Sequence, residues 1–214
     1  MAFLFCPCFG ASVETTITEP ADDTVVIAVI GPTGSGKSSF ISKAAGNQET
    51  EVGHANNIST RTTEVVATKF KDPESGFTIV LVDTPDFGHN TTKLLSDWLK
   101  KNYDNRAFLS AVLYFHRISD NRVVGTPLVN IGFLKQLCRE QRASQIILTT
   151  TMWDSVEEST GRERLSELKS DYWKTIIEEG SRTFSYLDTK ESARELMRMA
   201  LENQRGSLRG SRAG

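Results

Sequence analysis

Short runs of hydrophobic residues alternate along this chain with amphipathic stretches, and short polar connections separate them. Apolar, β-branched runs of this length are typical of buried strands. The six predicted strands are at residues 24–30, 64–70, 77–82, 109–115, 145–150 and 183–187. Helical periodicity predicts helices at residues 37–45, 92–103, 128–141, 156–179 and 190–203. This alternation predicts a three-layer α/β fold, in which a mainly parallel six-stranded sheet carries helices on both faces.

Two segments depart from simple strand–helix alternation. Residues 64–70 and 77–82 are joined by the polar turn 71–76, so this pair is predicted to form a β-hairpin. Residues 46–63 have no clear period and are rich in Asn, Thr and Gly, which predicts a long loop. Long loops inside compact domains are more often functional than idle.

A glycine-rich segment lies between the strand at 24–30 and the helix at 37–45. Residues 31–38 read Gly-Pro-Thr-Gly-Ser-Gly-Lys-Ser, which is a complete G-x-x-x-x-G-K-S phosphate-binding loop. Its glycines let successive backbone N–H groups surround phosphates, Lys37 can reach the β- and γ-phosphates, and the Ser38 hydroxyl can bind Mg²⁺. The sequence therefore predicts a nucleoside triphosphate site.

Two aspartates follow predicted strands, at the sheet edge where ligand sites form in α/β proteins. Asp83 begins Asp-Thr-Pro-Asp and is expected to act with Ser38 at Mg²⁺, the alternative being a simple turn. Asp154 ends Thr-Thr-Met-Trp-Asp, and its carboxylate can accept hydrogen bonds from guanine N1–H and the N2 amine, a pattern that adenine does not present. The alternative role of Asp154 is to cap the following helix.

Composition narrows the class of protein further. The 214 residues are 38% hydrophobic and 24% charged, which suits one α/β domain, expected at residues 21–204. The net charge of −2 is spread along the chain, so nucleic acid is not expected as a partner. Residues 205–214 are expected to form a basic disordered tail. The three cysteines fit no zinc or disulfide pattern and favour the cytoplasm.

Residues 1–20 form a separate N-terminal segment with an unusual composition. The segment lacks the basic leader and long apolar centre of a secretory signal, and Ala2 excludes N-myristoylation. Cys6 and Cys8 stand among large apolar residues, so they are candidates for palmitoylation and a peripheral membrane contact. The alternative is that the segment folds against the domain.

The order of these motifs resembles that of GTPases of the translation-factor-related class, particularly the septin-like branch. The chain looks like immunity-associated and avirulence-induced GTPases and chloroplast import-receptor GTPases, and most like the largely uncharacterised fungal G-domain proteins of that group. The segments that carry the resemblance are residues 31–38, 82–85, 114–122 and 150–154. The resemblance implies a P-loop NTPase fold (a G domain) that binds GTP or GDP with Mg²⁺. It also implies a loop threonine that closes on the metal and the γ-phosphate, here Thr62 or, as second choice, Thr63.

The candidate site residues follow from the motifs and this resemblance together. The candidates for nucleotide binding are Gly31, Pro32, Thr33, Gly34, Ser35, Gly36, Lys37, Ser38, Ser39, Thr151 and Asp154. The candidates for metal binding are Ser38, Thr62 and Asp83, and those for catalysis are Lys37, Thr62, Arg117 and Arg122. In the import-receptor relatives an arginine after the fourth strand reaches the nucleotide of the partner subunit. Arg117 and Arg122 occupy the comparable stretch, which suggests a homodimer across the nucleotide face, the alternative being a solvated polar loop.

Three departures from the family pattern bear on activity. Asp86 replaces the usual glycine of Asp-Thr-Pro-Gly, Phe87 stands where Ras-type enzymes carry the glutamine that orients water, and Met152 stands where many GTPases have a lysine packed along the nucleotide. We expect a slow Mg²⁺-dependent GTPase that acts as a switch or assembly module. The alternatives are a hydrolysis-deficient GDP-binding scaffold and a P-loop small-molecule kinase, although no arginine-bearing lid is visible.

Overall fold

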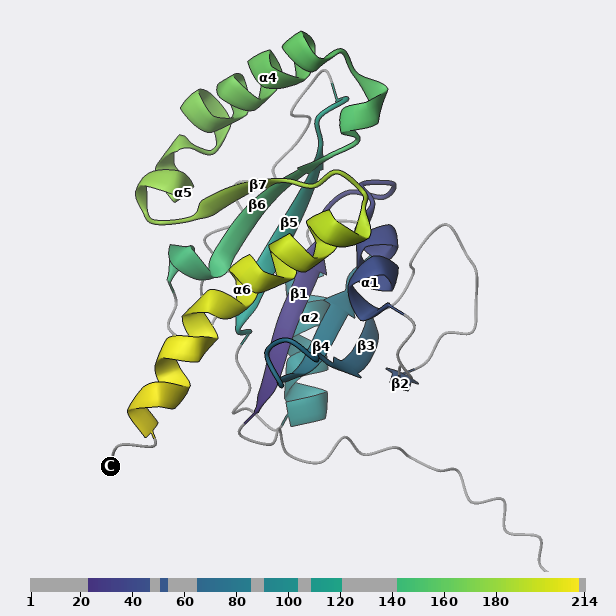
Figure 1. Cartoon of the computed structure of the whole chain (residues 1–214), viewed down its shortest axis with the longest axis vertical. Coiled ribbons are helices and arrows are strands. Elements are labelled where there is room, and N and C mark those ends of the chain that lie inside the picture. Colours follow the sequence, from purple (N-terminus) through teal and green to yellow (C-terminus); the bar gives the residue numbers. More distant parts are fainter. Residues whose placement is uncertain are drawn as a thin grey trace, which may run out of the picture.

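A computed structural model describes residues 23–46, 51–53, 65–85, 91–103, 109–120 and 142–211. Its centre is a seven-stranded sheet in the order β2-β3-β4-β1-β5-β6-β7 (Figure 1). The strands are β1 Thr24–Ile30, β2 Glu51–Gly53, β3 Val66–Lys71, β4 Thr78–Asp83, β5 Ala111–Arg117, β6 Ile146–Thr151 and β7 Arg182–Ser185. Strands β2, β3 and β4 pair antiparallel, and the remaining pairs are parallel. The predicted mainly parallel α/β fold and the β3–β4 hairpin are thereby confirmed.

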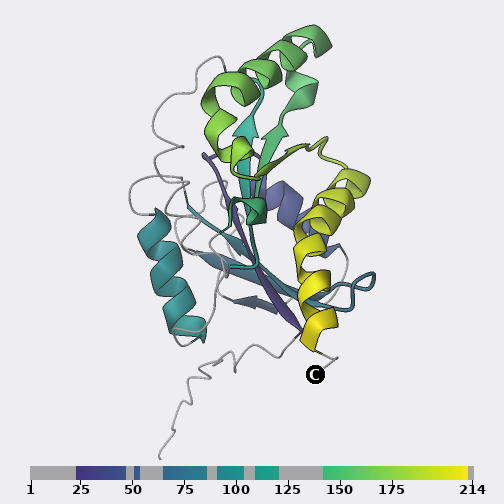
Figure 2. The ribbon, with the colours of Figure 1, turned by 90° about the vertical axis from the view of Figure 1, so that its left-hand side faces the viewer.

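Helices cover both faces of the sheet. They are α1 Lys37–Ala45, α2 Thr91–Tyr103, α4 Glu158–Glu167, α5 Lys174–Glu178 and α6 Lys190–Ser211, with the π-helix η3 Leu168–Tyr172 and the 3₁₀ turns η1 Ala143–Gln145 and η2 Trp153–Ser155. Helices α1 and α6 pack on one face, and α2 lies on the opposite face with the α4–α5 segment above it (Figure 2).

The central strand β1 supplies both halves of the core. Val25, Ile27 and Val29 belong to the cluster under α1 and α6, whereas the residues between them belong to the cluster under α2 and η3. Successive side chains of a strand point to opposite faces. A parallel strand that is buried on both sides therefore appears as the continuous apolar run seen in the sequence.

The predicted loop at residues 46–63 contains a strand that periodicity missed. Strand β2 pairs antiparallel with β3, with Val52 opposite Thr68. A strand of three residues is too short to show an alternating pattern of apolar and polar positions. This strand is therefore recognised only by its pairing with the edge of β3. The sheet consequently has seven strands instead of six.

The helix predicted at residues 156–179 is interrupted. The Trp173 N–H donates to the Leu168 carbonyl at 2.7 Å, which widens the turn between α4 and α5. Residues five apart on a regular α-helix point about 140° apart. The wider turn lets both Leu168 and Trp173 enter the core, and the Trp173 ring packs edge-on against Tyr114.

Helix α6 is longer than predicted and continues to Ser211, so most of the stretch 205–214, expected as a disordered tail, is helical. The predicted helix at 128–141, residues 1–20 with Cys6 and Cys8, and the site candidates Thr62 and Arg122 lie outside the described residues. Asp86 and Phe87 also lie outside them. Within the described part of the chain, no helix is both long enough and apolar enough to cross a bilayer.

Candidate nucleotide-binding site

The phosphate-binding loop connects the end of β1 to the start of α1. Gly31 has φ +148°, and a methyl group on it would lie only 2.4 Å from the Phe115 carbonyl oxygen of β5. Gly34 and Gly36 have φ values of +76° and +88°, which side-chain-bearing residues rarely adopt. The glycines are thus required by the backbone path itself, because the loop turns tightly against the neighbouring strand.

Lys37 lies within this loop. Its side chain is buried, and Nζ donates to the Gly31 carbonyl at 2.9 Å and to the Pro32 carbonyl at 3.2 Å. A buried ammonium is costly unless it is well solvated by acceptors, and here the loop carbonyls provide them. The charge is therefore held within the loop where phosphate oxygens would bind.

A hydroxyl–carboxylate pair lies beside the loop. The Ser38 Oγ donates to Asp83 Oδ2 at 2.8 Å, which joins the first turn of α1 to the end of β4. The next residue, Thr84, bonds through both N–H and Oγ1 to the Val29 carbonyl, so the end of β4 is fixed against β1. Mg²⁺ prefers hard oxygen ligands and retains several waters. A serine hydroxyl and an aspartate carboxylate fit this requirement.

The end of β6 is attached to the back of the loop. Thr151 Oγ1 donates to the Ser35 carbonyl at 3.0 Å and lies 3.3 Å from the His116 carbonyl. Met152 then adopts a left-handed conformation with φ +59°, and this turn begins η2, which contains the exposed Asp154. The residue that precedes α4 is Glu157, without a side-chain cap. Asp154 therefore does not cap α4, and its carboxylate faces solvent at the strand end.

The loop after β7 also contacts α1, although none of its residues is among the candidates predicted from the sequence. Asp188 Oδ1 accepts from Ser39 Oγ and Lys43 Nζ, both at 2.8 Å, and from the Tyr186 hydroxyl at 3.2 Å. Burial alone would raise the pKa of Asp188, but the hydrogen bonds from Lys43 and Ser39 and the Lys43 charge lower it. The position of Asp188 in the sequence could have identified it, because it follows a strand whose carboxyl end reaches the ligand-binding edge.

Arg117 ends β5, between the ends of β1 and β6. Its Nε lies 3.0 and 3.1 Å from the two carboxylate oxygens of Asp120. Its Nη1 lies 3.5 Å from the position of a methyl group on Gly34. The arginine thus approaches the phosphate-binding loop of its own chain.

The comparisons with known proteins agree with this geometry. The model of the 50S ribosome-binding GTPase family matches residues 26–152, which is more than half of the chain. This chain belongs to that GTPase family. The matched stretch begins in β1 and ends just after β6, so it contains the phosphate-binding loop, Asp83 and Thr151.

Solved GTPase structures share the fold of this GTPase. The structure of Toc33 from Arabidopsis thaliana in complex with Mg²⁺ and GMPPNP has a TM-score of 0.55 at 18% identity, over 78% of this chain and 72% of that one. The bacterial selenocysteine-specific elongation factor EF-Sec has a TM-score of 0.57 at 12% identity, over 86% of this chain and 29% of that one. A search of curated protein sequences found no match. The chain is therefore a P-loop GTPase G domain.

The structure brings most of the predicted site residues of this GTPase to one edge of the sheet. They are Gly31 to Ser38 of the loop, Asp83 after β4, Arg117 after β5, and Thr151 and Asp154 after β6. Ser39 lies on the same helix, with its hydroxyl bonded to Asp188. Thr62 and Arg122 lie outside the described residues.

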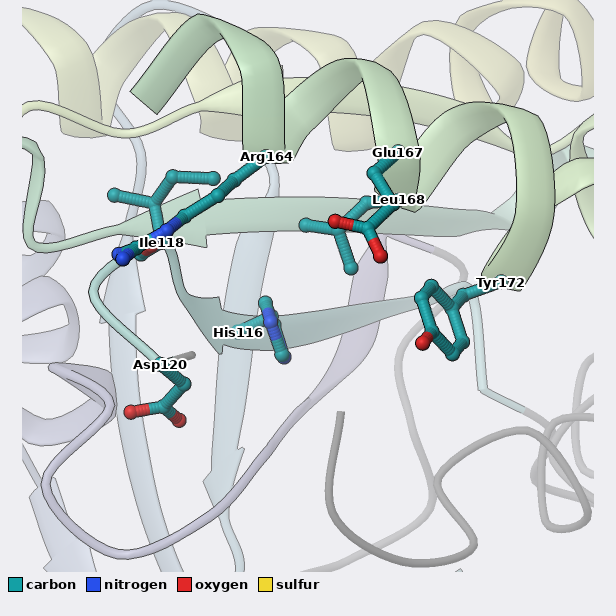
Figure 3. A pocket seen from close by; sticks show the side chains of 7 residues that line it. All are labelled: His116, Ile118, Asp120, Arg164, Glu167, Leu168 and Tyr172. Atoms are coloured by element: carbon teal, nitrogen blue, oxygen red, sulfur yellow. The ribbon is translucent and has the colours of Figure 1, made fainter. Parts of the chain in front are cut away.

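A separate cavity of about 310 Å³ lies between the end of β5 and the α4–η3 segment (Figure 3). Its lining residues are His116, Ile118, Asp120, Arg164, Glu167, Leu168 and Tyr172, and none belongs to the phosphate-binding loop. Burial lowers the pKa of His116, and Arg117 adds to this effect while Asp120 opposes it. A His116 with a lowered pKa is neutral at pH 7, as a core histidine beside Trp173 would be.

Proposed function

We propose that this GTPase binds GTP and GDP with Mg²⁺, hydrolyses GTP slowly, and acts as a nucleotide-dependent switch or assembly module of the septin-like kind. The main support for this proposal is the hydrogen bond from Ser38 to Asp83, next to the buried Lys37. The three side chains come from α1 and β4, and they provide the cation and the oxygen ligands that a Mg²⁺–triphosphate requires.

The residues of the phosphate-binding loop would catalyse hydrolysis. Loop N–H groups and Lys37 hold the β- and γ-phosphates in line with an attacking water and stabilise the charge that develops on them. The water oxygen bonds to the γ-phosphorus as the bond to the bridging oxygen breaks, and the water proton leaves with inorganic phosphate. Mg²⁺, held by Ser38, Asp83 and the loop threonine Thr62, would add neutralising charge.

Substitution of Lys37 tests the proposal. We expect Lys37→Ala to lose tight binding of fluorescent GDP and GTP analogues, because the substitution removes a cation from the loop. Lys174→Ala is the matched control, since Lys174 is exposed on α5 far from the loop in sequence. Unchanged affinity in Lys37→Ala, in a protein with a normal circular dichroism spectrum, would contradict the proposal.

The second candidate function is a scaffold that retains GDP and does not hydrolyse GTP. Asp86 and Phe87 favour it, because a carboxylate would face the γ-phosphate and no glutamine follows to orient water. Single-turnover hydrolysis of GTP separates the two functions. A rate no higher than that of Lys37→Ala would favour the scaffold.

A homodimer across the nucleotide face is also proposed. It is supported by a similar solved structure, for which dimerization is described as important for the GTPase activity of the chloroplast translocon components atToc33 and psToc159. That solved structure has a TM-score of 0.54 at 18% identity, over 78% of this chain and 71% of its own chain. Arg122 and Arg117 are the candidates for an arginine that crosses to the partner.

A cytoplasmic location with peripheral membrane contact completes the proposal. Cys6 and Cys8 among apolar neighbours would accept palmitate, and the acyl chains would hold the protein at a membrane surface. The test is a hydroxylamine-sensitive lipid label on the full chain in cells. Equal labelling of Cys6→Ser/Cys8→Ser and wild type would contradict it.

A further inference from the structure

The arginine at the end of β5 points to a function within its own chain. Arg117 Nη1 lies 3.5 Å from where a Gly34 methyl would be, so its guanidinium adjoins the central glycine of the phosphate-binding loop.

The approach of Arg117 is fixed by its surroundings. Both carboxylate oxygens of Asp120 hold Nε, and the Asp120 N–H donates to the Arg117 carbonyl at 3.2 Å. The following residue, Ile118, donates its N–H to Thr151 and accepts at its carbonyl from Arg164. The turn after β5 is thus held against β6 and α4, and the contacts with Asp120 that the structure describes use Nε and not the η nitrogens.

The strand order places Arg117 between the phosphate-binding loop and the base-reading candidate Asp154. The phosphate loop follows β1, the base-reading candidate Asp154 follows β6, and β5 lies between these two strands. Neighbouring strands are about 4.8 Å apart. A nucleotide with its phosphates at the loop and its base at Asp154 would therefore pass over the end of β5, which would bring its sugar–phosphate part close to Arg117.

Met152, just after the neighbouring strand β6, is the reason to expect a cation beside the nucleotide. Many GTPases have a lysine packed along the nucleotide where this chain has the uncharged Met152. The Met152 methyl lies 3.9 Å from the position of a Gly36 methyl, so this side chain packs against the loop as the lysine stem would. Its contribution is apolar contact without charge.

We propose that Arg117 supplies, within the same chain, the positive charge that Met152 lacks, and that it contacts the sugar–phosphate part common to GDP and GTP. This inference rests on the proposed nucleotide binding. It makes Arg117 an affinity-determining residue for both nucleotides and leaves any arginine that acts across a dimer to Arg122.

The test is a double-mutant cycle on the full chain with fluorescent GDP and GTP analogues. Arg117→Ala should weaken both nucleotides by a similar factor, roughly ten- to a hundredfold, as expected for loss of hydrogen bonds to a charged group. Met152→Lys should restore most of this loss in the Arg117→Ala background and add little to the wild type. Arg162→Ala is the matched control, because Arg162 is an exposed arginine of α4 paired with Glu158.

Several outcomes would overturn the inference. Wild-type affinity in Arg117→Ala would do so, as would a defect confined to hydrolysis that grows with protein concentration. Failure of Met152→Lys to restore affinity in the Arg117→Ala background would refute the idea that Arg117 replaces the missing lysine charge. Arg117→Lys retains the charge and should bind nucleotide better than Arg117→Ala, which separates loss of charge from misfolding. A wild type that binds no guanine nucleotide would instead defeat the proposed function.

Discussion

Asp154 is the residue on which the choice of base depends. We expect Asp154→Asn to shift preference from guanine toward xanthine nucleotides, because an amide donor replaces one carboxylate acceptor and xanthine carries a carbonyl where guanine carries its amine. Competition by GTP, XTP and ATP against a fluorescent nucleotide measures the shift. Glu157→Gln serves as control, since Glu157 is a nearby exposed acidic residue. An equal loss for all three competitors would show that Asp154 reads no base.

Residue identities in the site were largely predictable because each motif is local. The loop at residues 31–38 and the aspartates at 83 and 154 follow recognisable strands, and the structure places all of them at one sheet edge. Asp188 was missed, because its partners Ser39 and Lys43 lie 149 and 145 positions away. No local pattern reports such a contact.

At the scale of elements, the connection from β1 to α1 depends on glycine conformation and space together. Gly31→Ala should lower the free energy of unfolding by at least about 2 kcal/mol, because its methyl would meet a backbone carbonyl oxygen at 2.4 Å. Gly46→Ala, at the end of α1 with φ +64° and no atom of the described residues within 4 Å, should cost less, because only backbone strain opposes its methyl group. Denaturant unfolding of the two variants compares them. Equal losses would mean that contact with β5 contributes nothing beyond backbone strain.

The elements themselves show where periodicity is sufficient. Strands β1, β4, β5 and β6 were predicted within one or two residues, since burial on both faces leaves a continuous apolar run. The π-helix at Leu168–Tyr172 was not predicted from helical periodicity. Its wider turn lets Leu168 and Trp173 both enter the same core. That requirement comes from packing against β5 and β6.

For the whole molecule, the question is whether two copies cooperate. If a dimer forms across the nucleotide face, the specific GTPase activity of the wild type should rise with protein concentration, because an arginine then acts across the interface. Arg122→Ala should abolish this rise while leaving nucleotide affinity unchanged. Hydrolysis rates over a wide range of protein concentration, with sedimentation in parallel, measure the effect. A rate per molecule that stays constant at every concentration would exclude the dimer mechanism.

The sequence by itself determined the fold class, the phosphate-binding loop and the positions of both aspartates, because strand burial and glycine-rich turns leave signals within a few residues. Tertiary structure decided which groups lie together: Ser38 with Asp83, Thr151 with the loop, and Arg117 beside Gly34. These contacts depend on the order of β4, β1, β5 and β6 in the sheet. Strand order is set by how the whole core packs, so the chemistry of the residues was readable in advance but their pairing was not.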